Sequence, residues 1–210
     1  MMLIGQYDSP FVRRVGIAMT LYGMAFDHQP WSAFGDGEKI AQFSPLRRVP
    51  TLVMDDGVAL SDSWAIIDTL DQMVGPDRAL IAASGPDRRE AMRIIALAAG
   101  AADKSVALVY ERVLREQALV IWVERCRSQV SGALDALETA RGSSSAPWLF
   151  GDQIGHADII MATYLRFARE ALPEVFDLSG RPALAAHTER AEALPVFRAV
   201  CQPFVINPPT

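Results

Sequence analysis

The sequence predicts an α+β fold in which a small mixed domain of strands and helices is followed by an all-helical domain. The first observation is an apolar run at residues 2–6, followed by apolar residues at helical spacing and a second strand-like run at 25–31. The second is that apolar residues beyond residue 88 recur at helical spacing. The third is a pair of Gly-Pro breakers, at 75–76 and 85–86. We therefore expect domains at residues 1–75 and 88–210, joined by a linker at residues 76–87.

Ser9 and Pro10 mark the start of the first helix. Serine is a favoured N-terminal cap, and proline is tolerated at the first helical position because the N–H that it lacks would have no helical partner there. Gly23 is expected to end the helix. Arg13 and Arg14 are expected near the polar side of this helix, opposite its apolar residues. A strand, a helix and a strand with short joints predict a βαβ unit.

Residues 51–61 predict a hairpin that leads into a capped helix. Thr51 to Met54 and Val58 to Leu60 have the composition of two short strands, and the intervening Asp-Asp-Gly has the chemistry of a tight turn. Pro50 marks either an edge strand or a proline that presents a backbone edge, in some cases through a cis bond. Asp62 and Ser63 precede an apolar helical pattern, where they would either cap the helix or hold the charged end of a ligand.

Composition limits the functions that the chain can have. The formal net charge of −5 argues against a nucleic-acid partner, because phosphate binding requires a basic surface. The first ten residues do not resemble a signal peptide, and no apolar run reaches the roughly eighteen residues of a membrane span. The two cysteines, Cys126 and Cys201, fit reduced thiols in a cytoplasmic protein. The three histidines have no ligand-like spacing, so we expect no metal site.

Four motifs together resemble the soluble glutathione S-transferases over nearly the full length of the chain. They are Ser9-Pro10-Phe11-Val12-Arg13, Ser44-Pro45-Leu46-Arg47-Arg48-Val49-Pro50, Asp62-Ser63-Trp64-Ala65-Ile66 and Gly151-Asp152-Gln153-Ile154-Gly155-His156-Ala157-Asp158. The chain is most similar to bacterial members in which the first turn has the sequence S-P-x-V-R. The resemblance implies a thioredoxin-like N-terminal domain, an all-helical C-terminal bundle, a cytoplasmic homodimer with a role in detoxification, and an active site near the domain cleft.

The resemblance also implies roles for particular residues in binding glutathione. Pro50 matches the cis proline of the family, so the backbone of Val49 would pair with the cysteinyl part of glutathione. Asp62 and Ser63 match the pair that receives the γ-glutamyl amine and carboxylate. Arg48 lies where the family often has a polar or basic residue near the glycyl carboxylate. Glutathione is therefore the expected co-substrate.

Ser9 is the expected catalytic residue, because it resembles the hydroxyl that faces the glutathione sulfur. Tyr7, two residues earlier, is the alternative donor, and Ser9 would then only cap its helix. Thiol–disulfide exchange through the protein is not expected, since it requires a cysteine at the start of the first helix, where this chain has Ser9.

The second substrate is expected to be a hydrophobic electrophile bound over the sulfur. Phe11, Phe34, Val106 and Tyr110 are candidates to line its pocket, although apolar residues at helical spacing also form ordinary core. The favoured reaction is attack of the glutathione thiolate on an electrophilic carbon. Two alternatives stay open: a non-catalytic binding or regulatory protein of this fold, and a glutathione-dependent isomerase or peroxidase.

The chain departs from the family pattern at two places. The usual Asn-Pro-x-Gly is replaced by Ser44-Pro45-Leu46-Arg47, so the loop before Pro50 is expected to differ in shape. Gly155 stands three residues before Asp158, where the family commonly has serine or threonine. Glycine is a tolerated helix cap at a cost of only a few tenths of a kcal/mol, so we expect this helix to form.

Overall fold

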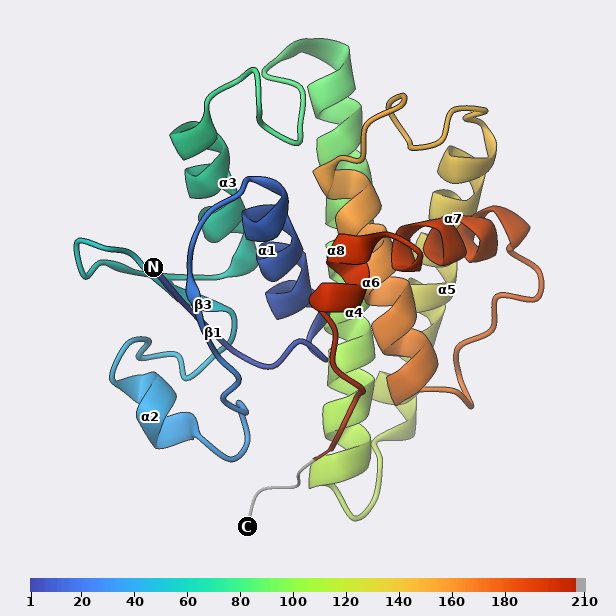
Figure 1. Ribbon diagram of the computed structural model, residues 1–210. Helices are drawn as coiled ribbons and strands as arrows, with labels where there is room; N and C mark the ends of the chain where they lie inside the picture. Colours follow the sequence, from blue (N-terminus) through green and yellow to red (C-terminus); the bar gives the residue numbers. More distant parts are fainter. Residues whose placement is uncertain (207–210) are drawn as a thin grey trace. The chain divides into compact units, whose positions relative to one another are not determined.

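The computed structural model describes residues 1–206 and divides the chain into two compact units. The first unit comprises Met1–Ala83 together with residues 194–206, and the second comprises Ser84–Ala193. All four strands lie in the first unit, and the second unit is helical (Figure 1). The predicted α+β fold class is confirmed.

The first unit is built on a four-stranded mixed sheet with the strand order β2-β1-β3-β4. The strands are β1 (Met2–Ile4), β2 (Asp27–Gln29), β3 (Thr51–Val53) and β4 (Ala59–Ser61). β1 and β2 are parallel and joined through a helix, which confirms the βαβ unit, whereas β1/β3 and β3/β4 are antiparallel. β1, β2 and β3 are shorter than the runs that predicted them, whereas β4 has the predicted length and begins one residue later. β1, for example, ends at Ile4, because the next residue, Gly5, has a φ of 130° and takes the chain out of the sheet.

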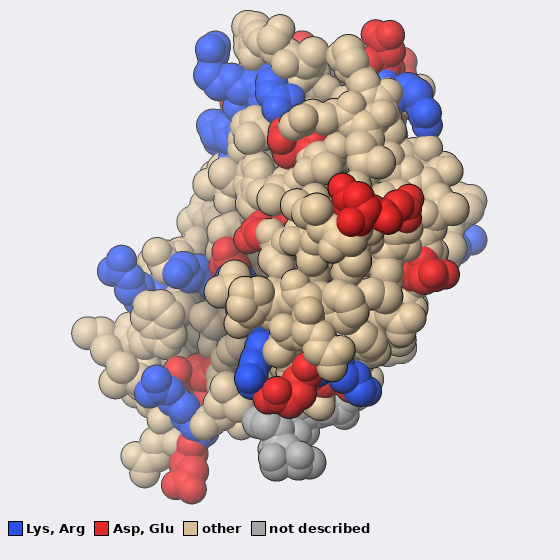
Figure 2. Space-filling model, turned by 90° about the vertical axis from the view of Figure 1, so that its left-hand side faces the viewer, with Lys and Arg blue, Asp and Glu red and all other residues tan. Residues whose placement is uncertain are grey.

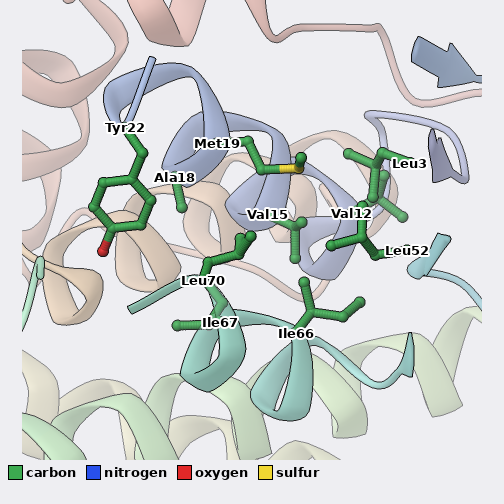
Figure 3. Packing of buried hydrophobic residues seen from close by; sticks show 10 residues of the cluster. All are labelled: Leu3, Val12, Val15, Ala18, Met19, Tyr22, Leu52, Ile66, Ile67 and Leu70. Carbon is green, nitrogen blue, oxygen red and sulfur yellow. The ribbon is translucent and has the colours of Figure 1, made fainter. Parts of the chain in front are cut away.

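The core of this unit lies between the sheet and two helices, α1 (Pro10–Leu21) and α3 (Ser63–Val74). Figure 3 shows the side chains of α1 and α3 pointing toward one another, with Leu3 of β1 and Leu52 of β3 beside them. Burial of each large aliphatic side chain contributes about 1.5–3 kcal/mol. As predicted, α1 begins after Ser9 and ends just before Gly23, whose φ is 69°. The short helices α2 (Gly37–Ala41) and α8 (Pro195–Ala199) complete the unit.

The expectation that Arg13 and Arg14 lie on a polar side of α1 is wrong, because both side chains are buried. The Arg13 guanidinium donates to the carbonyl oxygens of Phe197 and Val200, each at 2.8 Å. α1 is therefore covered on this side by α8 and the residues after it. The same contacts explain why the structure groups residues 194–206 with the first unit, whereas the sequence placed them in the helical domain.

The second unit consists of α4 (Gly85–Leu114), α5 (Val120–Gly142), α6 (His156–Ala171) and α7 (Pro182–Glu192). Most residues of α6 are buried, and this helix packs against α4 and α7. α4 begins at Gly85, inside the predicted linker of residues 76–87. Pro86 and Asp87 explain this early start, since proline fits the first turn of a helix and an acidic residue there interacts favourably with the helix dipole.

α6 forms despite the glycine at its start, as expected. The Asp158 carboxylate accepts hydrogen bonds from the amides of Leu149, at 3.0 Å, and Gly155, at 2.9 Å. Burial raises the pKa of Asp158, and these two bonds oppose that shift. The carboxylate thus ties the start of α6 to the preceding loop.

None of the helices within residues 1–206 has the length and apolarity that crossing a membrane requires. On the face shown in Figure 2, Lys and Arg side chains are interspersed with Asp and Glu.

Candidate active site

Three segments of the first unit meet at one edge of the sheet because of its strand order. Ile4, at the end of β1, is opposite Thr51, at the start of β3, and Thr51 is opposite Ser61, at the end of β4. The turn that follows β1, the loop before β3 and the start of α3 after β4 therefore share this edge. These segments carry Ser9, Val49 and the Asp62-Ser63 pair, respectively, so the fold brings together residues that are more than fifty positions apart in the sequence.

Gly5 allows two of these segments to approach closely. A methyl group at Gly5 would lie 2.5 Å from Val12 Cγ2 and 2.8 Å from Val49 Cβ, so even the smallest side chain would clash here. Its φ of 130° also lies in the region that favours glycine. The start of α1 consequently lies against the loop that contains Val49.

The loop before β3 presents an unpaired section of backbone. The Val49–Pro50 peptide bond is cis, as expected from the resemblance. The Thr51 hydroxyl donates to the carbonyl oxygen of Arg48 at 3.0 Å, which holds the loop from the inside. Among residues 1–206, no hydrogen bond is formed by the amide or the carbonyl of Val49. Its backbone can therefore accept and donate to an extended ligand.

Asp62 has an unusual backbone conformation. Its φ is 75° and its ψ is 129°, a region that is sparsely populated by residues other than glycine. The side chain is exposed, and one carboxylate oxygen accepts from the amide of Trp64 at 2.9 Å. Strain of this kind is concentrated at functional sites, where it holds a group in a required place. Here it holds a carboxylate at the start of α3.

Ser63 is the first residue of α3 and is buried, in contrast to its neighbour. Its hydroxyl oxygen accepts a hydrogen bond from the Arg14 guanidinium at a long distance of 3.4 Å. The amides of the first turn have no acceptors within the helix and carry the positive end of its dipole. The start of α3 thus combines an exposed carboxylate with a group of hydrogen-bond donors.

Ser9 caps α1, since its hydroxyl oxygen accepts from the amide of Val12 at 3.4 Å. This bond uses a lone pair and leaves the hydroxyl proton available to a second acceptor. Tyr7, the alternative donor, stacks on His28 with ring centroids 3.8 Å apart. Burial raises the pKa of the Tyr7 phenol, which makes it a weaker acid than a free tyrosine.

The loop that departs from the family pattern retains one feature of that pattern. Arg47, at the position of the family's glycine, has a φ of 50°, in the left-handed region that glycine favours. Its guanidinium forms an exposed ion pair with Glu38 at 2.9 Å. Ser44 is buried and accepts from the Ser61 hydroxyl at 2.8 Å, which joins the loop to the end of β4. Arg48 is exposed.

The four residues predicted to line a second-substrate pocket are divided between the two units. Phe11 and Phe34 are half-buried in the first unit, whereas Val106 and Tyr110 belong to α4 in the second. Val106 is half-buried and Tyr110 is 40% exposed. Their common pocket stays a prediction. Within the described residues, no three His, Cys, Asp or Glu side chains are grouped as metal ligands would be.

Sequence reasoning missed the burial of Arg14 and its contact with Ser63 at the start of α3. A signal for its burial was present: the five residues that follow, Val15 to Met19, are all apolar or glycine. A helix that is apolar on all sides is buried on all sides. Arginines at the start of such a segment therefore need partners inside the protein.

The chain matches two family models whose matched regions together span more than half of its residues. The glutathione S-transferase N-terminal domain matches residues 3–78, and the glutathione S-transferase C-terminal domain matches residues 121–190. Together with the mixed sheet and the helical unit, these matches show that the chain belongs to the glutathione S-transferase family. The first unit is the thioredoxin-like domain of this family, as the resemblance implied.

Three individual proteins illustrate the relationship. The uncharacterized GST-like protein YibF of Escherichia coli is 31% identical over 81% of this chain and 85% of its own length. The maleylacetoacetate isomerase of Pseudomonas aeruginosa is 30% identical over 94% of each chain. The crystal structure of a glutathione transferase family member from Pseudomonas fluorescens Pf-5 with bound glutathione is 29% identical, covers 97% of this chain and 99% of its own, and superposes with a TM-score of 0.81.

Proposed function

We propose that this protein is a glutathione transferase that binds glutathione at the shared sheet edge and stabilises its thiolate for attack on a hydrophobic electrophile. The observation that carries the proposal is the meeting of three different groups at that edge. They are the unpaired backbone of Val49, the strained and exposed Asp62 beside Ser63, and the Ser9 hydroxyl at the start of α1. Together they offer an extended backbone edge, a site for an α-amino acid end and a donor for sulfur.

Each part of the tripeptide has a chemical complement at this edge. The backbone of Val49 would pair with the cysteinyl unit of an extended peptide, as one strand pairs with another. The Asp62 carboxylate would receive the γ-glutamyl amine, and Ser63 with the first amides of α3 would receive the γ-glutamyl carboxylate. Arg48, an exposed residue of the loop before β3, would attract the glycyl carboxylate.

The role of Ser9 follows from the acidity of thiols. A free thiol has a pKa of about 8.5, so only a few per cent is thiolate at neutral pH. A hydrogen bond to a charged group contributes roughly 1.5–3 kcal/mol, the equivalent of about one to two pKa units. One hydrogen bond donated by Ser9, together with the positive end of α1, would therefore lower the thiol pKa to about 7 or below. Ser9 would donate a hydrogen bond and would not abstract a proton.

The second substrate would be an electrophilic carbon compound that contacts Phe11, Phe34, Val106 and Tyr110. Family membership supports the further proposal that the protein acts as a homodimer in the cytoplasm. A glutathione-dependent isomerase is the second candidate function, since the Pseudomonas aeruginosa isomerase is similar over nearly the whole chain. Such an enzyme would use the same glutathione site and a different second substrate.

The proposal is tested by calorimetric titration with glutathione, followed by ultraviolet titration of the bound thiol in the native protein and in Ser9→Ala. We expect glutathione to bind both proteins and the thiol pKa to rise by about one to two units in the variant. Ser9→Thr, which keeps the hydroxyl, is the matched control and should retain a low thiol pKa. A fall in thiolate content in Tyr7→Phe, with none in Ser9→Ala, would assign the donor to Tyr7.

Two assays separate the possible functions of a protein that binds glutathione. Conjugation of a generic aryl halide supports the transferase, whereas cis–trans isomerisation of maleylacetoacetate without conjugation supports the isomerase. Binding without either activity would favour a non-catalytic member of the family. Absence of glutathione binding by the folded protein would refute the proposal as a whole.

A further inference from the structure

Arg14 lies directly beneath the start of α3, where the proposed site would hold the α-amino acid end of glutathione. Its side chain is 1% exposed, and its guanidinium carbon lies 5.4 Å from the centre of the Trp64 ring. The hydrogen bond to Ser63 Oγ joins it to the first residue of the helix. A buried cation is costly unless negative charge or hydrogen-bond acceptors surround it. The buried charge of Arg14 beneath the start of α3 therefore needs compensating groups nearby.

Within residues 1–206, the Arg14 guanidinium forms no direct ion pair with a carboxylate. Asp62 and Asp71 are the two carboxylates whose fields act on the guanidinium. Asp62 is exposed and accepts from the Trp64 amide, and Asp71 accepts from the Tyr22 hydroxyl. Burial lowers the pKa of Arg14 to about 10, and the two carboxylates oppose this shift. Arg14 is thus a cation at neutral pH whose field extends to the start of α3.

The hydrogen bond between Arg14 and Ser63 also has a fixed direction. A guanidinium can only donate, so it occupies a lone pair of Ser63 Oγ. The Ser63 hydroxyl proton must then point to another acceptor. The amides of the first helical turn offer further donors. Around Ser63, the protein therefore presents donors and positive charge, which suit a carboxylate and repel an amine.

We propose that Arg14 is a positioning residue that makes the Ser63 side of the site specific for the α-carboxylate of the γ-glutamyl group, while Asp62 selects the amine. This inference rests on the proposed glutathione-binding function and adds a reason why the amine and the carboxylate of the γ-glutamyl group are bound at separate places. Arg14 acts through Ser63 and through its field, without touching the ligand. The zwitterionic end of the peptide is then bound in one orientation, because the two charges have separate and opposite complements.

Three peptides test this division of roles in calorimetric titrations. Glutathione carries both charged groups, glutaryl-cysteinylglycine lacks the α-amine, and 4-aminobutyryl-cysteinylglycine lacks the α-carboxylate. We expect Arg14→Met to weaken binding of the two peptides that carry the carboxylate by about tenfold or more, the scale of the hydrogen bond from Ser63 to the carboxylate that Arg14 orients. Binding of 4-aminobutyryl-cysteinylglycine should be unchanged.

Arg13 supplies the matched control, since it is the adjacent buried arginine with different partners. Its guanidinium bonds to carbonyl oxygens of α8 and the residue after it, and it lies 5.3 Å from the centre of the Phe197 ring. Arg13→Met should therefore lower stability and leave the ratio of affinities among the three peptides as it is in the native protein. Arg14→Lys, which keeps a buried charge and donor, should retain most of the preference for the carboxylate.

The possible outcomes distinguish this inference from the proposed function. If the native protein does not bind glutathione, the proposed function fails and this inference fails with it. If the native protein binds glutathione but Arg14→Met weakens all three peptides by the same factor, Arg14 is merely structural and this inference alone is refuted. Should Arg14→Met not fold, Arg14→Gln removes the charge while keeping a polar side chain, and the same comparison applies.

Discussion

Replacement of Asp62 by glycine is expected to stabilise the protein and to weaken glutathione binding. Asp62 has a φ of 75° and a ψ of 129°, which costs a residue other than glycine about 1–3 kcal/mol. Glycine avoids this strain but loses about 0.5–1 kcal/mol more chain entropy on folding. It also gives up the cap to the Trp64 amide, at a cost of a few tenths of a kcal/mol. The difference leaves a net gain of about 1 kcal/mol.

The loss of the carboxylate acts in the opposite direction on ligand affinity. A charge-assisted bond between Asp62 and the γ-glutamyl amine would contribute about 1.5–3 kcal/mol, which corresponds to about a tenfold to hundredfold change in dissociation constant. Asp62→Asn is the matched control, because it keeps a capping oxygen and the same backbone while removing the charge. Its stability should stay near that of the native protein, and its affinity should fall as in the glycine variant.

Both effects are measured on the full chain without other changes. Thermal unfolding without ligand should show a midpoint for Asp62→Gly that is about 2–4 °C higher, the shift expected per kcal/mol for a protein of this size. Calorimetric titration gives the dissociation constant for glutathione. A clear loss of stability in Asp62→Gly would contradict the strain, and an unchanged affinity in both variants would contradict the proposed role of the carboxylate.

Two further predictions concern stability alone. Arg47→Gly should stabilise the protein by up to about 1 kcal/mol, because it relieves the left-handed backbone at this residue and removes only an exposed ion pair with Glu38. Arg48→Gly is the control and should destabilise the protein, since the φ of Arg48 is ordinary. Denaturant unfolding measures both changes, and equal effects would contradict the left-handed conformation of Arg47. Burial lowers the pKa of His187 to about 4, so below about pH 6.5 the unfolded chain binds a proton at this histidine that the folded protein does not bind. The free energy of unfolding should therefore decrease as the pH falls from about 6.5 toward 4, by up to about 3 kcal/mol. Asp158, whose pKa is raised by burial, has the opposite effect on stability over this range. His187→Gln isolates the contribution of the histidine, because the unfolding free energy of this variant should fall less steeply with pH. Parallel curves for the native protein and the variant would refute the role of His187.

Local sequence patterns predicted most of the secondary structure correctly. The Ser9-Pro10 start and the Gly23 end of α1, the Asp-Asp-Gly turn and the cap of α3 all depend on the chemistry of neighbouring residues. Interactions of this kind extend over a few positions, so they can be read without knowledge of the fold. Strand ends were less accurate, because each strand stops where its partner stops and not where its own apolar run stops.

The motifs in the sequence determined the family and the identity of the candidate site residues, since each motif is a short run of neighbouring side chains. Tertiary structure alone decided which groups surround the buried Arg13 and Arg14, and it alone decided the backbone strain of Asp62. The physical reason is that burial and strain depend on contacts made by distant segments. Arg13 meets residues 197 and 200, and Arg14 meets Ser63. The helical pattern of α1 specifies a turn of backbone, but only the segments packed around it decide that the charged side chain of Arg14 points inward and contacts a residue 49 positions away.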